Sequence, residues 1–218
     1  MVWALVPQLK TNGRNFVGVR PLSDGDIDKI VVEDDTPDGG MFFDHGQALF
    51  SGRRVDPTTV PSQMRADRTG PLPDFGRTYG LMYVSDKFKE VVERIEPGKH
   101  QFLPFEIIGS NGRHIADMWF MIVCNRLDSV DRSLTTKALY RGVMWQPARE
   151  VPREYWPEHV TAETPSRLVF NLTQIGSHHL WFDKHIGTAQ VPYSSDILVD
   201  CLKAANVTGV TFTELEDV

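Results

Sequence analysis

Two stretches of this chain carry the same pattern of a capped helix followed by a strand. They read YVSDKFKEVVERIEPGKHQF at 83–102 and YSSDILVDCLKAANVTGVTF at 193–212, and they align without a gap. Ser85 and Ser195 stand where a hydroxyl can cap the first turn of a helix. The Asp after each serine lies where the helix dipole favours a negative charge. We therefore expect a structural role for Asp86 and Asp196.

The apolar residues of both stretches recur at i, i+3, i+4 and i+7, which places them on one face of a helix. The two sets are Phe88, Val91, Val92, Ile95 and Leu198, Cys201, Leu202, Ala205. Any amphipathic helix shares this stripe, so the matches outside it carry more weight. Tyr83 aligns with Tyr193, and Phe102 aligns with Phe212. The pattern predicts an α+β fold, with a mixed sheet, few helices and two similar strand–helix–strand units.

The remaining sequence indicates two parts. Residues 1–78 are interrupted by many Gly, Pro and Asp residues, which predicts a loop-rich N-terminal part with short strands, and 60–80 has the pattern of a loop. Residues 79–218 hold the repeated units and the apolar stretch 114–131, which is typical of a buried central strand. Residues 167–183 favour two strands joined near Gly176. With 218 residues the chain is large enough to fold as one compact domain, which we expect.

The net charge of −6 is concentrated in residues 23–44, where eight acids and one base give −7 and leave +1 for the rest of the chain. A protein that binds nucleic acid needs a basic face, so this distribution disfavours such a partner. An acidic segment suits a basic protein or a cation, and a solvated loop has the same composition. The candidate binding residues in it are Asp24, Asp26, Asp28, Glu33, Asp34, Asp35 and Asp38.

A second candidate surface lies in the Pro-punctuated segment 140–156. Trp, Tyr and Arg are the residue types enriched at the energetic centres of protein interfaces. The segment could display them to a partner, or its two tryptophans could belong to the core. The candidates are Arg141, Trp145, Arg149, Arg153, Tyr155 and Trp156.

No catalytic motif stands out in the sequence. There is no G-x-S-x-G, and GSNGRH at 109–114 lacks the spacing and the lysine of a phosphate loop. The alternative of a small hydrolase would have to use His45 or His185 with a nearby carboxylate. On a strand, His179 and His185 would lie about 20 Å apart, too far to share one metal ion. We assign no catalytic, cofactor or metal residue, and whether 178–185 binds anything stays open.

Export and membrane insertion are not indicated. The chain has no run of 18 apolar residues, and MVWALVPQLK lacks the basic region and cleavage site of a signal peptide. Cys124 and Cys201 lie in apolar patterns, so we expect buried thiols rather than a disulfide. We expect a cytoplasmic protein without a membrane partner.

The C-terminal part resembles a known family. HLWFDKHIG followed by VPYSSDILVDCLKAANVTGVTF, with YVSDKFKEVVERI, FLPFEI and NRLDSVD before it, is similar to the bacterial immunity proteins of type eleven from polymorphic toxin systems. The resemblance covers about 79–215, and Phe182 stands where an arginine would be typical of the family. The resemblance implies a protein that is not an enzyme and that takes part in bacterial competition, for example by type VI secretion. Such a protein binds a cognate toxin in the cytoplasm and blocks it.

Charge complementarity suggests which surface of the implied toxin partner would face this chain. Many toxin active sites that handle nucleic acid are basic, so the acidic segment could speed the encounter with such a surface and fix its orientation. A small hydrolase and a general peptide-binding or scaffold module remain the alternatives.

Overall fold

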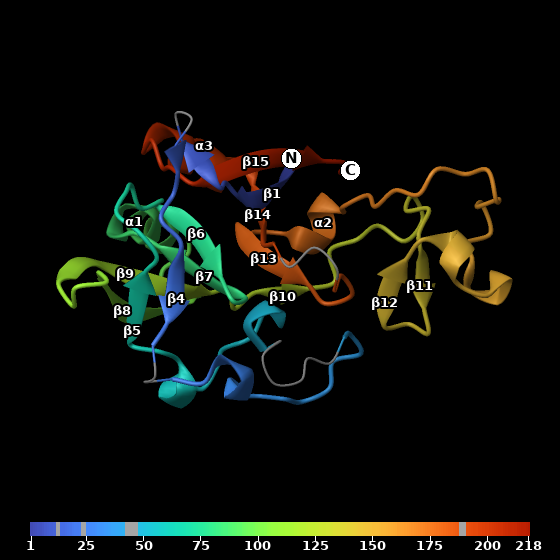
Figure 1. Ribbon diagram of the computed structural model, residues 1–218. Coiled ribbons are helices and arrows are strands. Elements are labelled where there is room, and N and C mark those ends of the chain that lie inside the picture. Colours follow the sequence, from blue (N-terminus) through green and yellow to red (C-terminus); the bar gives the residue numbers. More distant parts are fainter. Residues whose placement is uncertain (12–13, 23–24, 42–47, 188–190) are drawn as a thin grey trace.

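The computed structural model of the protein describes residues 1–11, 14–22, 25–41, 48–187 and 191–218 (Figure 1). Strands dominate these ranges. The α-helices are α1 (Asp86–Ile95), the single-turn α2 (Leu172–Ile175) and α3 (Asp196–Ala204). Short 3₁₀ turns lie at Ile27–Lys29, Ala48–Phe50, Pro57–Thr59, Ala148–Glu150 and Arg153–Tyr155. No helix in the described part of the chain has the length and apolar character needed to cross a membrane.

Two larger sheets form the body of the molecule. One has the order β4 (Val19–Pro21), β5 (Gln63–Ala66), β8 (Gln101–Ile108), β9 (His114–Ile122), β7 (Leu81–Val84) and β6 (Phe75–Thr78). The other has the order β10 (Arg126–Leu127), β13 (Leu180–Asp183), β14 (Tyr193–Ser195), β1 (Val2–Pro7) and β15 (Val210–Leu215). The described residues also form two two-stranded hairpins. One pairs β2 (Lys10–Thr11) with β3 (Arg14–Asn15), and the other pairs β11 (Ala138–Tyr140) with β12 (Met144–Gln146).

Both larger sheets mix parallel and antiparallel neighbours. β5 runs parallel to β8, and β10 runs parallel to β13, whereas the other neighbouring pairs are antiparallel. The predicted α+β fold, with a mixed sheet, few helices and two similar strand–helix–strand units, is therefore confirmed.

The two units share a feature outside the aligned sequence. In each unit a third strand lies between the other two and pairs with them in the same register. β9 lies between β7 and β8, and β1 lies between β14 and β15. The equivalent cross-strand pairs are Val84–Trp119 and Ser194–Trp3, then Phe102–Met121 and Phe212–Leu5. The enclosed strand follows the helix in the first unit and precedes it in the second. The structural repeat therefore includes one more strand per unit than the aligned sequence does.

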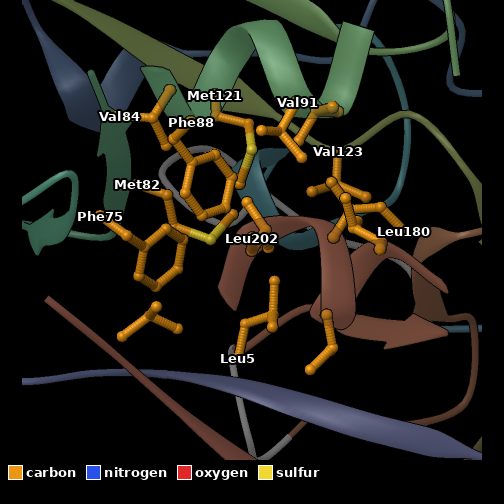
Figure 2. Packing of buried hydrophobic residues seen from close by; sticks show 14 of the residues in the cluster. Leu5, Phe75, Met82, Val84, Phe88, Val91, Met121, Val123, Leu180 and Leu202 are labelled. Carbon is orange, nitrogen blue, oxygen red and sulfur yellow. The ribbon is translucent and has the colours of Figure 1, made fainter. Parts of the chain in front are cut away.

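The two repeated helices pack against each other and bury their matching stripes in one core (Figure 2). Phe88 and Val91 from α1 face Leu202 from α3, and Leu5 and Leu180 come from the strands of the second sheet. All five side chains are buried. Burial of an apolar side chain of this size contributes about 1.5–3 kcal/mol. The stripe seen in the sequence is therefore the centre of the fold.

The serines cap their helices as predicted. Ser85 Oγ accepts the Phe88 N–H at 3.3 Å, and Ser195 Oγ accepts the Leu198 N–H at 3.3 Å. Asp86 also has a structural partner, since its Oδ1 accepts the Trp119 Nε1–H at 2.6 Å.

The loop expected at 60–80 is wrong, because this segment contributes β5 and β6. In β5, Met64 and Ala66 are buried and alternate with partly exposed residues, which is the strand period. The strand pairs with β4 and β8, which are distant in sequence. β5 has only four residues, between Pro61 and Gly70, and so short a strand does not show a periodicity in the sequence alone.

The strand expected within 167–176 is also wrong. Asn171 caps the short helix α2 by accepting the Gln174 N–H at 3.0 Å. Phe170 makes only isolated bridges, to Val130 and Asp217. The second expected strand, β13, is present, so no hairpin joins the two segments. Cys124 and Cys201 are free thiols, but both are partly buried and not fully buried as expected.

Asp74 links the two units at the N-terminal end of α1. Its Oδ1 accepts the Ser85 hydroxyl at 2.7 Å, and its Oδ2 accepts the N–H and the hydroxyl of Thr208, each at 2.8 Å. Lys87 Nζ lies 2.8 Å from the same Oδ2. Burial alone would raise the pKa of Asp74, but these hydrogen bonds outweigh it and hold the pKa below its ordinary value.

We expect Asp74→Asn to lower the free energy of unfolding by about 2 kcal/mol at pH 7, because several hydrogen bonds to a charged group are weakened. The folded-state pKa lies below the unfolded one, so this contribution is present above about pH 4 and is lost as the pH falls through the folded pKa. Urea unfolding at pH 7 and pH 3 should show the difference shrinking at the lower pH. Asp200→Asn, at an exposed position of α3, is the matched control, and an equal effect of the two variants would contradict the assignment.

Candidate functional site

Residues 138–160 form a lobe that projects from the body of the molecule (Figure 1). The β11–β12 hairpin opens it, and the two 3₁₀ turns at 148–150 and 153–155 follow. Its own small core consists of Ala138, Ala148, Val151 and Val160, with Tyr140, Tyr155 and Trp156 packed against them. The lobe is therefore a separately packed element that carries the second candidate surface.

The tryptophans of this surface are turned inward. Trp145 is only 5% exposed and packs in the core beneath the lobe, where its backbone N–H donates to the His185 carbonyl at 2.9 Å. Trp156 is half-buried, and its Nε1–H donates to the Val151 carbonyl at 3.0 Å. Tyr155 packs edge-on against Tyr140, with 5.0 Å between the ring centroids.

The arginines of the lobe face solvent. Arg141, Arg149 and Arg153 are all exposed. Arg153 lies over the Trp156 ring at 5.1 Å, and Arg141 lies over the Tyr140 ring at the same distance. Arg141 also has a φ of +54°, which is unusual for a residue with a Cβ. The aromatic rings thus support a set of solvent-facing guanidinium groups.

A buried arginine fixes the acidic segment to the body. Arg126 is 7% exposed, and its Nε donates to Asp38 Oδ2 at 2.7 Å while its Nη2 donates to Asp38 Oδ1 at 3.0 Å. The same guanidinium donates to the carbonyls of Ser51 at 2.9 Å and Met41 at 2.7 Å. Hydrogen bonds from Arg126 outweigh burial and hold the pKa of Asp38 well below its ordinary range. Asp38 is therefore a structural residue.

A second arginine shapes the turn that precedes Asp38. Arg53 donates to the carbonyls of Asp34 at 2.6 Å and Thr36 at 2.7 Å, and it lies 3.4 Å from Asp38. Asp34 Oδ1 accepts the Thr36 N–H at 2.9 Å. The path of the backbone from 34 to 38 is thus set by bonds to the two arginines and by a local turn.

The remaining acids divide into paired and unpaired groups. Asp26 lies 2.8 Å from Lys29, and Glu33 lies 3.9 Å from Arg54. Asp28 and Asp35 are exposed, and neither makes an ion pair or a side-chain hydrogen bond within the described ranges. Asp24 lies outside the described residues. The carboxylates best placed for a partner are therefore those of Asp28 and Asp35.

The two candidate surfaces meet at a pocket of about 160 Å³. Its walls are residues 35–41, Val32, Ser51, Arg53 and Arg126 on one side and Val143 from the β11–β12 turn on the other. This meeting could not be predicted from the sequence, because the two segments are about a hundred residues apart. We call the exposed parts of 28–41 and 140–156 around this pocket the docking face.

The two residues that follow β13 hold the two halves of the docking face together. Lys184 accepts the Met41 N–H at 2.7 Å through its carbonyl, and its Nζ donates to the Asp38 carbonyl at 3.2 Å. The next residue, His185, donates from Nδ1 to the Val143 carbonyl at 2.9 Å. Adjacent residues of one strand end therefore bind the acidic segment and the lobe.

This role for His185 disfavours a catalytic one. The residue is 2% exposed, and its Nε2 lies 3.6 Å from Asp128. Burial raises the pKa of the neighbouring Asp183, which accepts the backbone N–H of His185 at 2.8 Å. His45 and Asp44 lie outside the described residues. Within the described ranges, no group of three His, Cys, Asp or Glu side chains could hold a metal ion.

A buried polar cluster at the end of α1 was not anticipated. Glu96 is 6% exposed, and its Oε2 lies 2.8 Å from His100 Nε2. Its Oε1 accepts from Asn125 Nδ2 and from the His179 N–H, each at 3.0 Å. His100 Nδ1 accepts the Cys124 N–H at 3.1 Å, so Nε2 carries the proton that reaches Glu96. The cluster satisfies its members internally and is structural.

Comparison with known proteins adds one match. The model of a family described as an immunity protein family (Imm11) matches residues 28–217. The matched range includes the lobe and the acidic segment from Asp28 onward. A search of curated proteins found no match.

We expect Arg126→Lys to lower the free energy of unfolding by about 3 kcal/mol, because an ammonium group cannot reproduce the fork of bonds to Asp38, Ser51 and Met41. Urea unfolding measures the loss, and hydrogen exchange should show faster opening at the Met41 amide. The matched control is Arg132→Lys, an exposed arginine paired with Asp128 at 2.7 Å, for which we expect a change below about 0.5 kcal/mol. Similar small effects at both positions would contradict the structural role of Arg126.

Proposed function

We propose, on the premise that this chain belongs to the Imm11 immunity protein family, that it neutralises a cognate bacterial toxin by binding it through the docking face. Family membership indicates an immunity protein that acts without catalysis and has a toxin as its partner. The proposal adds that binding occurs in the cytoplasm and occludes the working surface of the toxin. It also places the pair in a polymorphic toxin system used in bacterial competition, including type VI secretion.

The observation that carries the proposal is the convergence of two candidate surfaces on one pocket. Asp35 lines this pocket with an unpaired carboxylate, and the lobe reaches the pocket through Val143. Asp28 in the acidic segment and Arg141, Arg149 and Arg153 in the lobe are exposed outside the pocket lining. Carboxylates on an interface rim steer a basic partner and raise the association rate. Arginine is one of the residue types enriched among those that dominate binding energy at interfaces. One face therefore supports both steering and anchoring.

The docking face is also organised before a partner arrives. Arg126 and Arg53 bond to backbone carbonyls of the acidic segment, and Lys184 and His185 bond to both halves. A surface that is already ordered loses less conformational entropy on binding. This supports tight binding to one partner rather than weak binding to many, as a general scaffold module would show.

We also propose that the chain forms one compact domain. Residues 1–78 supply β1, which is enclosed by β14 and β15, and β5, which pairs with β8. A fragment of residues 79–218 would lack the enclosed strand of its second unit. The boundary suggested by composition near residue 78 therefore does not coincide with an independent sheet.

The direct test is co-expression with the toxin encoded beside this chain's gene. We expect cells to survive only when the chain is present, and we expect the two proteins to elute as one complex in size-exclusion chromatography. Cell death despite a stable, folded chain would contradict neutralisation. Protection without a complex would contradict binding as its mechanism.

We expect the double variant Asp28→Asn with Asp35→Asn to lower the association rate with the toxin about fivefold at low ionic strength and to flatten its salt dependence. Asp34→Asn removes charge but keeps an oxygen that can accept the Thr36 N–H, so it adds to the effect without altering the turn. Surface plasmon resonance at several salt concentrations gives these rates. Glu90→Gln, on the exposed side of α1, is the control, and an unchanged rate in the double variant would exclude the acidic segment as the steering element.

A further inference from the structure

A second and larger hollow lies among different residues from those of the docking face. It has a volume of about 810 Å³. Its walls come from residues 6–10, 15–18 and 76–79, together with Arg68, Pro73, Tyr83 and Val191. None of these residues lines the pocket of the docking face. We call this hollow the β6 groove, because the edge strand β6 forms one wall.

The β6 groove is positively charged, although the chain as a whole is acidic. Among the described residues, Lys10, Arg68 and Arg77 line it and no Asp or Glu does. Two of these cations also have contacts within the chain, since Arg68 Nη2 donates to the Phe16 carbonyl at 2.6 Å and Arg77 lies over the Phe50 ring at 5.0 Å. One acid, Asp67, lies beside the groove, where it accepts the Gly18 N–H at 3.1 Å and lies 3.8 Å from Arg68. The chain has a net charge of −6, whereas the groove keeps an excess of positive charge even when Asp67 is counted. Such a local excess attracts negative charge.

The rim of the groove carries the two large apolar side chains that are most exposed in the described part of the chain. Leu9 is 81% exposed and Tyr79 is 67% exposed. The backbone beneath Leu9 is held in place, because the Gln8 N–H donates to Gly209 at 2.7 Å and Leu9 accepts the Phe16 N–H at 3.0 Å. The exposure of Leu9 therefore belongs to an ordered surface.

Tyr79 occupies a backbone position that does not suit it. It has a φ of +46° and is followed by Gly80 with a φ of +86°, in the two-residue turn that joins β6 to β7. Both positive angles are those of a type I′ turn, whose first central position favours Asn, Asp or Gly. An exposed tyrosine at this position costs stability without packing in the core. Such strain is found where a side chain serves binding.

From these observations we infer that the β6 groove binds an acidic polypeptide segment whose apolar side chains pack on Leu9 and Tyr79. The three cations match carboxylates, and the two rim side chains match apolar residues on an extended chain. The cations line a hollow and do not form a flat patch, so a polypeptide can reach them and a bilayer surface cannot. The inference does not depend on the toxin, because it concerns different residues from the docking face.

The test selects peptides from a random 12-residue phage library on the full chain. We expect the selected peptides to be rich in Asp and Glu interspersed with apolar residues, and to bind the purified chain in fluorescence anisotropy. Tyr79→Asn should weaken this binding at least tenfold. Its melting temperature should be equal or higher, because Asn suits the positive φ. Lys10→Glu should weaken binding about fivefold, and less at high salt.

The controls are placed on the β8–β9 hairpin and β9. Ile115→Thr removes an exposed apolar side chain, and Arg113→Glu reverses an exposed charge; both should leave peptide binding unchanged. No enrichment, enrichment without excess carboxylates, or equal binding by the groove variants would overturn the inference. Binding of the chain to phosphatidylserine vesicles that is lost in Tyr79→Asn would also overturn it, in favour of a membrane surface. Loss of toxin protection in Tyr79→Asn, without peptide binding, would assign the groove to the toxin instead.

Discussion

The packing of α1 against α3 is the interaction on which the rest of the structure depends. A helix of nine or ten residues is not stable alone in water, so each needs the apolar face of the other. Polar groups close the two ends of the contact. Asp74 joins the start of α1 to the segment after α3, and Glu96 joins the end of α1 to His179, whose ring bonds to Ser195 at the start of α3. The helices therefore run antiparallel, and each end of the contact is fixed by a carboxylate, partly buried at Asp74 and buried at Glu96.

The elements that the sequence predicted well are those that local spacing defines. The stripes and caps of α1 and α3 involve neighbours within one or two turns, so they can be read without knowing the fold. Strands β5 and β6 could not be predicted, because four-residue strands are defined by partners far away in the chain. The positions of β9 and β1 between the two strands of their units could not be predicted for the same reason. A gapless alignment of two contiguous stretches cannot show that each stretch pairs with a third strand in the same register.

The candidate site shows a similar division. Composition identified an acidic segment and a segment rich in Arg and aromatic residues, but it could not say which side chains were already engaged. Asp38 proved to be bound by Arg126, and Trp145 proved to be in the core. Lys184 and His185, which hold the face together, belong to a stretch that first drew attention as a possible metal or catalytic site. The pocket of the docking face and the β6 groove are lined by different residues, with the carboxylate of Asp35 at the first and cations at the second.

The differing chain order of the two units has a consequence for how the protein folds. In the first unit all four elements, from β7 to β9, are contiguous, so the unit can close as soon as residue 122 is available. In the second unit β1 finds its neighbours only at Tyr193–Ser195 and Val210–Leu215. Closing so long a loop has an entropic cost, and contacts of large sequence separation form slowly. The first unit is therefore the natural nucleus, and β1 lacks its neighbours in the second unit until β14 is available.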